Sequence, residues 1–399
     1  MHTPSPEERN RLWSRLTDAV AAHPEPLPTP LMVVDLDAFD ANAADLARRA
    51  GGTPIRVASK SLRVPELVRR ALGLPGFAGV LGYTLAEALW LVENGVSDDV
   101  VVGYPTVDRG ALARLAASPT ALEAITVMVD DVDQLDLLPR ASVRVALDVD
   151  AGLRLARAHL GPKRSPLATP AAVIALACEV LRRGHRLVGV MTYEGQVAGM
   201  ADDVPGQRAR SLLLRQVKSL SVAQLATRRA EIAAALADLV ELEFWNAGGS
   251  GSLETSSSDP VVTEVTAGSG LLVSRLFDHY RAFTPRPAAY VGVPVTRRPA
   301  PGMITVHGGG LIASGASGRD RLPTPWAPAG LELTPLEGAG EVQTPLTGPA
   351  ADLLRVGDLV WLRHAKSGEP FEHTTTAWLL SGDRIVEGVP TYRGHGLAF

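Results

Sequence analysis

The feature that most constrains the fold is a regular alternation of short β-prone runs with helix-like segments. The β-prone runs occupy residues 31–36, 55–59, 77–81, 99–104, 125–129, 143–149, 186–191 and 242–246. The helix-like segments between them imply parallel strands, because parallel neighbours need a long crossover connection. Eight such units are the number in a closed (β/α)8 TIM barrel. An open doubly wound sheet is the alternative, although no GxGxxG motif opens the first helix-like segment.

The character of the chain changes after residue 285. Prolines become frequent, helical periodicity ends, and strand-like runs such as ITVHGGG and LRVGDLVWLRHA are separated by Gly, Pro and Asp. This pattern is typical of a β-rich domain. We therefore predict an N-terminal helical segment over residues 1–27, an α/β barrel over 28–284 and a C-terminal β domain over 285–399.

Composition excludes several classes of partner. The net charge of −4 comes without a basic stripe, which argues against binding to nucleic acid. No apolar run reaches the ~20 residues of a membrane span, and the opening MHTPSPEERNRLWSRL does not resemble a signal peptide. The single cysteine, Cys178, fits a reducing compartment. We expect a cytoplasmic protein with no nucleic-acid or membrane partner.

A lysine stands where a predicted strand ends and a helix begins, in the stretch RVASKSLRVPEL over residues 56–67. In (β/α)8 barrels the chemistry lies at this end, because the βα loops gather there. A desolvated lysine has a lowered pKa and forms an imine with a carbonyl group. Lys60, at the end of the second predicted strand, is thus the candidate nucleophile, and a solvated loop lysine is the alternative interpretation.

Two glycine-rich segments follow the last predicted strands. WNAGGSGS covers residues 245–252 and TAGSGLL covers 266–272. Glycines let the backbone turn several N–H groups towards one point, and the serines add hydroxyl donors, an arrangement that suits a phosphate group. A flexible linker is the alternative for the first segment. A reactive lysine combined with a phosphate-binding turn suggests pyridoxal 5′-phosphate as the cofactor.

The order of these segments resembles a known family, the fold-type III pyridoxal phosphate enzymes of the alanine racemase-like group. Within this group the chain is similar to the D-threonine aldolase and D-serine dehydratase subfamily. The segments that carry the resemblance are TPLMVVDLDAFDANAADLARRA, SKSLRVPELVRRAL, GYTLAEALWLVENGVSDDVVVGYP, LVGVMTYEGQ, GGSGS and TEVTAGS. The resemblance extends over about residues 28 to 395. It implies a homodimer in which the partner's β domain closes the active site.

The resemblance also implies roles for single residues. Lys60 matches the lysine that attaches the cofactor, and Tyr193 matches a tyrosine beside it. An arginine faces the pyridine nitrogen in this family; Arg154 is the candidate here, with Arg157 as the second choice. Such an arginine keeps that nitrogen unprotonated and makes the ring a weaker electron sink. The residues that match the phosphate-binding backbone and hydroxyl groups are Gly249, Ser250, Gly251, Gly268 and Ser269.

The chain departs from the subfamily in the segment WLRHAKSGEPFEH. The related enzymes resemble H-x-D or H-x-C here, a pair that binds a divalent cation, whereas this chain has His364 followed by Lys366. A protonated ammonium group repels a metal ion and cannot coordinate it. The resemblance therefore leaves a divalent metal in doubt. Glu369, Glu372 and His373 are the nearby residues that could rebuild a metal site, or else form a solvated turn.

These observations predict a lyase that cleaves a small, D-configured β-hydroxy amino acid by a retro-aldol reaction. Lys60 would hold the cofactor, and His364 with Lys366 would take the proton of the β-hydroxyl group. Dehydration with deamination, and racemisation, are the alternatives on the same scaffold. A non-catalytic pyridoxal phosphate carrier is a further class, but such carriers consist of a barrel alone.

Overall fold

The computed structural model describes residues 4–156, 158–282, 284 and 286–399. Its first part is a closed barrel of parallel strands in the order β10-β11-β2-β3-β4-β5-β6-β9. This confirms the predicted (β/α)8 barrel. The barrel strands are β2 (Ile55–Ala58), β3 (Phe77–Gly82), β4 (Val100–Val102), β5 (Ile125–Val129), β6 (Arg144–Asp148), β9 (Arg186–Thr192), β10 (Phe244–Ala247) and β11 (Glu264–Ala267).

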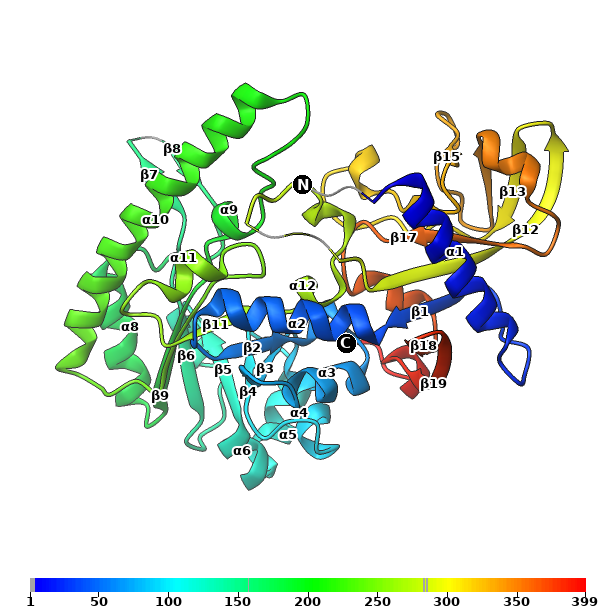
Figure 1. The fold of residues 1–399 in the computed structure, drawn as a ribbon. Coiled ribbons are helices and arrows are strands. Elements are labelled where there is room, and N and C mark those ends of the chain that lie inside the picture. Colours follow the sequence, from blue (N-terminus) through cyan, green and yellow to red (C-terminus); the bar gives the residue numbers. More distant parts are fainter. Residues whose placement is uncertain (1–3, 157, 283, 285) are drawn as a thin grey trace.

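Helices surround the barrel and form its outer layer (Figure 1). Local signals fix several of their ends: Pro65 starts α3, and Gly51, in a left-handed conformation with φ 61°, ends α2. The helices of this part are α2 (Leu36–Ala50), α3 (Pro65–Leu72), α4 (Leu85–Glu93), α5 (Arg109–Ala117), α6 (Pro119–Ala124), α7 (Val132–Leu135), α8 (Pro170–Arg182), α9 (Gly195–Ala198), α10 (Arg208–Ala237), α11 (Leu253–Ser257) and α12 (Ser269–Leu272). A short hairpin of β7 (Leu153–Leu155) and β8 (Ala158–Leu160) follows β6.

The first predicted strand does not belong to the barrel. β1 (Leu31–Asp35) pairs with β12 and β18 of the C-terminal sheet, so the assignment of residues 31–36 to the barrel is wrong. Its place is taken by β11. All five residues of β1 are buried, and a short buried run fits the centre of either sheet equally well. The sequence therefore could not decide between the two sheets.

The C-terminal part is a sheet of nine strands, β1 included, with mostly antiparallel pairing. It confirms the predicted β-rich character, whereas the domain limits at residues 27 and 284 stay a prediction. Its other strands are β12 (Ala289–Ala300), β13 (Met303–His307), β14 (Thr324–Ala327), β15 (Glu332–Leu333), β16 (Gln343–Thr347), β17 (Leu359–Arg363), β18 (Thr376–Ser381) and β19 (Arg384–Pro390). Short 3-10 turns are η1 (Ser59–Ser61), η2 (Arg275–Phe277), η3 (Arg319–Arg321), η4 (Pro349–Leu353), η5 (Glu369–His373) and η6 (Arg393–His395).

The N-terminal helix α1 (Pro6–Ala21) packs on this sheet rather than on the barrel (Figure 1). The indole nitrogen of Trp13 donates a hydrogen bond to the carbonyl oxygen of Leu359 at 2.7 Å. Among the described residues, no helix is both long and apolar enough to cross a bilayer. The arrangement brings β1, α1 and the C-terminal strands together beside the barrel mouth.

Candidate active site

A cavity of about 310 Å³ lies at the carboxyl ends of the barrel strands. Its wall includes residues that end or directly follow those strands, which is where barrel enzymes place their chemistry. The C-terminal part closes one side with Lys366, Ser367 and Glu369. The cavity is therefore lined by both the barrel and the C-terminal part of the same chain.

Lys60 lines this cavity from η1, immediately after β2. Because β1 lies outside the barrel, β2 is the first barrel strand in chain order and not the second. The Lys60 ammonium group donates a hydrogen bond to the hydroxyl oxygen of Tyr104 at 2.6 Å. Its backbone is covered by Gly368, where a Cβ atom would lie 2.0 Å from the Lys60 carbonyl oxygen. Only glycine fits at this contact between the two parts of the chain.

The two glycine-rich segments lie side by side on the cavity wall. Ser250 Oγ accepts hydrogen bonds from the backbone N–H groups of Gly270 at 2.9 Å and Gly268 at 3.4 Å, which ties the two turns together. A Cβ atom at Gly268 would lie 2.5 Å from the carbonyl oxygen of Ala58, next to Lys60. The predicted phosphate residues that line the cavity are Gly249, Ser250, Gly268 and Ser269, whereas Gly251 is packed behind them against Ala198.

Tyr193 follows β9 and faces the cavity beside Gly249. Burial raises the pKa of the Tyr193 phenol to about 12, so the group stays protonated at neutral pH. Its ring edge would be 3.4 Å from a Cβ atom placed on Gly249. The tyrosine thus lies against the first glycine-rich turn, and its place beside the cofactor stays a prediction.

The predicted pyridine-nitrogen arginine lies elsewhere. Arg154 does not line the cavity, and its guanidinium group donates to the Asp150 carboxylate at 2.8 and 3.1 Å. Arg157 lies outside the described residues. Two arginines do line the cavity, Arg63 and Arg164, and the guanidinium carbon of Arg164 is 5.9 Å from the centre of the Tyr104 ring. Sequence reasoning missed Arg164, although it lies next to Lys163 in the GPKRSP turn of the same loop.

His364 is buried behind the cavity wall. Burial, and then the neighbouring Arg363, lower the pKa of the imidazole to about 3, so it is neutral at pH 7. Its Nε2 lies 3.1 Å from Ser367 Oγ, and Ser367 lines the cavity. The structure therefore does not bring His364 itself to the cavity, and Ser367 links it to the cavity wall.

Lys366 lines the cavity and is paired on its outer side. Its ammonium group donates to Glu369 at 2.9 Å and also contacts Ser314 Oγ. Burial alone would raise the pKa of Glu369, but hydrogen bonds from Ser314 and Lys366 outweigh burial and lower the pKa. Over the part of the chain that the structure describes, no three His, Cys, Asp or Glu side chains gather as a metal site would require. Glu372 instead pairs with Arg63 at 2.9 Å.

Asp148 is a second cavity residue that sequence reasoning missed. It ends β6 and lines the cavity. Burial, followed by repulsion from Asp130, raises the pKa of this carboxyl group from 3.8 to about 7. The signal was available in the sequence as the acidic end of the β-prone run VRVALDV. The group can hold or release a proton near neutral pH.

This pKa shift predicts a pH-dependent effect of Asp148→Asn on the stability of the cofactor-free protein. The pKa of Asp148 is higher in the folded than in the unfolded protein, so ionisation of this carboxyl group destabilises the fold. The destabilisation is absent below pH 4 and increases as the pH rises to about 7. Asparagine cannot ionise, so the variant should gain stability over the wild type across this window, by on the order of 2 kcal/mol after solvent screening. Urea unfolding at several pH values measures the difference. Asp98→Asn, at an exposed position, is the control, and a gain independent of pH would contradict the prediction.

The comparison with known families decides the classification. The family described as alanine racemase, N-terminal domain matches residues 34–274, more than half of the chain. The chain belongs to this family. The matched region begins in β1 and ends after α12, so it contains the barrel, Lys60 and both glycine-rich turns.

Individual relatives agree with this placement. A D-threonine aldolase from Arthrobacter sp. is 29% identical over 254 residues, which is 60% of this chain and 60% of that protein. The aligned segment thus spans well under two thirds of the curated relative. The structure of D-threonine aldolase from Filomicrobium marinum has a TM-score of 0.76 at 23% identity and covers 93% of this chain and 97% of that one. The structure of D-threo-3-hydroxyaspartate dehydratase from Delftia sp. HT23 has a TM-score of 0.71 at 19% identity and covers 92% of this chain and 97% of that one. At these identities the two structures establish the shared fold.

Proposed function

We propose that the protein is a pyridoxal phosphate-dependent lyase that cleaves a small D-configured β-hydroxy amino acid by a retro-aldol reaction. The observation that carries the proposal is that Lys60 and both glycine-rich turns line one cavity at the carboxyl ends of the barrel strands. The relative named D-threonine aldolase supports the reaction type. The proposal includes a homodimer, as the resemblance implies, and a cytoplasmic location, which the single cysteine favours.

The residues present fit the cofactor. The cavity offers the primary amine of Lys60 directly after β2 and, beside it, hydroxyl groups and backbone at Ser250 and Ser269. A side chain is excluded at Gly268, because a Cβ atom there would collide with Ala58. Lys60 would hold the cofactor's aldehyde carbon and the turns would hold its phosphate, with Tyr193 and Arg164 against the ring. We keep Arg154 as a residue that orients this loop through Asp150.

Bound pyridoxal phosphate would supply an electron sink for the electron pair that is left on Cα when the Cα–Cβ bond breaks. The chain supplies the proton transfers and the exclusion of water. Lys60 and Tyr104, joined at 2.6 Å, form a pair that can pass a proton on one side of the cavity. On the side formed by the C-terminal part, Ser367, which is hydrogen-bonded to neutral His364, can accept a hydrogen bond from the β-hydroxyl group, while the Lys366 charge stabilises the developing alkoxide. With a pKa of about 3, His364 is too weak a base to keep the proton itself.

A dehydratase that releases ammonia is the second candidate. The fold is shared with a D-threo-3-hydroxyaspartate dehydratase, and two groups at the cavity can donate a proton to a leaving hydroxyl group. These are Lys366 and Asp148, whose pKa of about 7 leaves it partly protonated at neutral pH. Racemisation would require a base on each face of Cα.

A product panel tests the proposal. Protein loaded with pyridoxal phosphate is incubated with D- and L-forms of serine, threonine and 3-hydroxyaspartate, and the products are identified. We expect glycine and an aldehyde from a D-substrate. Keto acid with ammonia would establish the dehydratase instead, and the opposite enantiomer would establish a racemase. The absence of all three kinds of product across the panel would contradict the proposed substrate class.

A further inference from the structure

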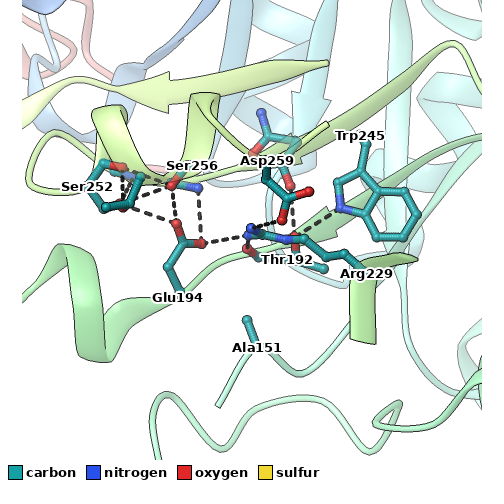
Figure 2. Close-up of polar contacts among 12 residues, drawn as sticks. Ala151, Thr192, Glu194, Arg229, Trp245, Ser252, Ser256 and Asp259 are labelled. Atoms are coloured by element: carbon teal, nitrogen blue, oxygen red, sulfur yellow. Dashed lines mark hydrogen bonds and ion pairs between the residues drawn. The ribbon is translucent and has the colours of Figure 1, made fainter. Parts of the chain in front are cut away.

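A buried polar network lies behind the first glycine-rich turn, outside the cavity (Figure 2). At its centre is Glu194, which follows Tyr193 after β9. Its carboxylate accepts hydrogen bonds from the backbone N–H of Gly248 at 3.2 Å, the hydroxyl of Ser252 at 3.3 Å, the hydroxyl of Ser256, and the guanidinium group of Arg229 at 3.1 Å. Four donors thus converge on one carboxylate.

Arg229, from α10, holds this carboxylate in place. It also donates to the Thr192 hydroxyl at 2.9 Å, to the Thr192 carbonyl at 3.1 Å and to Asp259 at 3.1 Å. The side chains of Arg229 and Glu194 are only 4% and 3% exposed. A buried ion pair is rigid when further hydrogen bonds satisfy both partners, as they do here, and breaking it leaves an uncompensated charge. The long helix α10 is therefore fixed to the end of β9 and to the turn.

The network contacts both ends of the turn over residues 248–252. Glu194 holds both of its ends, at Gly248, which has a φ of +78°, and at Ser252. Ser252 Oγ in addition accepts the backbone N–H of Gly249 at 3.2 Å, which closes the turn. Between the two held ends, Gly249 and Ser250 face the cavity.

We infer that Glu194, held by Arg229, is a positioning residue that keeps the turn over residues 248–252 in the conformation that binds the phosphate group of the cofactor. Neither side chain lines the cavity, so both act through the turn. The inference rests on the proposed function, because that function supplies the phosphate ligand. The inference adds two charged residues, Glu194 and Arg229, which act by fixing the backbone conformation of residues 248–252.

Comparing ligands with and without a phosphate group tests this inference. Cofactor-free Glu194→Gln protein is titrated with pyridoxal phosphate and, separately, with pyridoxal, following the absorbance and fluorescence of each ligand. The glutamine amide can accept from some of the four donors, but its NH₂ group opposes at least one of them. We expect the Kd for pyridoxal phosphate to rise at least tenfold and the Kd for pyridoxal to change less than twofold. Ser252→Ala removes one of the four donors to Glu194 together with the acceptor of the Gly249 N–H group, and it should weaken pyridoxal phosphate binding about threefold.

Glu264→Gln is the matched control. Glu264 is also a buried partner of an arginine, accepting from Arg56 at 2.8 Å, but it stands at the amino end of β11 and does not line the cavity. It should lower the midpoint of thermal unfolding without changing the ratio of the two Kd values. Equal weakening of both ligands by Glu194→Gln, or wild-type affinity for pyridoxal phosphate in Ser252→Ala, would overturn the inference. A wild-type protein that binds pyridoxal phosphate no more tightly than pyridoxal would instead overturn the phosphate site of the proposed function, and the inference with it.

Discussion

Replacing Lys60 with alanine is expected to reduce turnover at least a thousandfold while leaving the fold intact. The methyl group of alanine can neither attach the cofactor nor carry a proton, and each of these losses is large in enzymes that use a lysine in this way. The side chain is exposed to the cavity, and its ammonium group donates a hydrogen bond to the hydroxyl oxygen of Tyr104. The free energy of unfolding should therefore change by less than about 1 kcal/mol.

The chain itself offers the control for this variant. Lys163 is an exposed lysine of the same chain and does not line the cavity. Lys163→Ala should keep wild-type turnover. Steady-state kinetics on the substrate identified by the product panel measures both variants, and urea unfolding checks their stability. Lys60→Ala protein that turns over at more than a tenth of the wild-type rate would contradict the assignment.

Replacing Lys366 with alanine is expected to slow turnover roughly a hundredfold or more, which corresponds to a loss of about two to four kcal/mol of transition-state stabilisation. The ammonium group stands where similar enzymes are expected to place an anionic metal ligand, and it can stabilise a developing alkoxide by its charge. Its contacts with Glu369 and Ser314 hold it at the cavity wall. The Kd for pyridoxal phosphate should stay within twofold of the wild type, because Lys366 is not part of the glycine-rich turns.

The same hypothesis predicts that wild-type activity survives exhaustive treatment with a chelator. Activity that is lost with the chelator and restored by manganese or zinc would contradict it. In that case other side chains would have to complete a metal site, and Glu369 would be the first to examine because it already lies at the cavity. A Lys366→Asp variant provides a further comparison, since it restores the acidic residue that the resemblance places beside His364.

Local patterns in the sequence predicted most of the barrel and the position of Lys60. Strands with helix-like segments between them, and glycines directly after a strand, are properties of neighbouring residues. For that reason Lys60, Ser250 and Ser269 could be placed at the carboxyl ends of strands, and the structure brings them to one cavity. β1 was misassigned because a buried run contains no information about which sheet it joins.

Residues whose role depends on distant partners could not be predicted. Glu194 contacts Arg229 and Ser256, which are 35 and 62 residues away in the sequence, and no local sequence pattern predicts these contacts. His364 was predicted to face the substrate from a motif match alone. Such a match contains no information about whether the side chain is buried. Its pKa of about 3 follows from the surrounding apolar core and from Arg363, which only the fold brings into view. Arg154 was predicted to face the cofactor from the segment DVDAGLRLAR, which does not align cleanly with the motif of the similar enzymes, and its side chain does not line the cavity.

The most direct test of the central claim is to trap the cofactor on the protein. The chain contains four lysines, Lys60, Lys163, Lys218 and Lys366, of which Lys60 and Lys366 line the cavity. Wild-type protein loaded with pyridoxal phosphate is reduced with borohydride, digested, and analysed by mass spectrometry. We predict one stoichiometric pyridoxyl phosphate adduct, located on Lys60. An adduct on Lys366 or on any other lysine, or no adduct at all, would contradict the account.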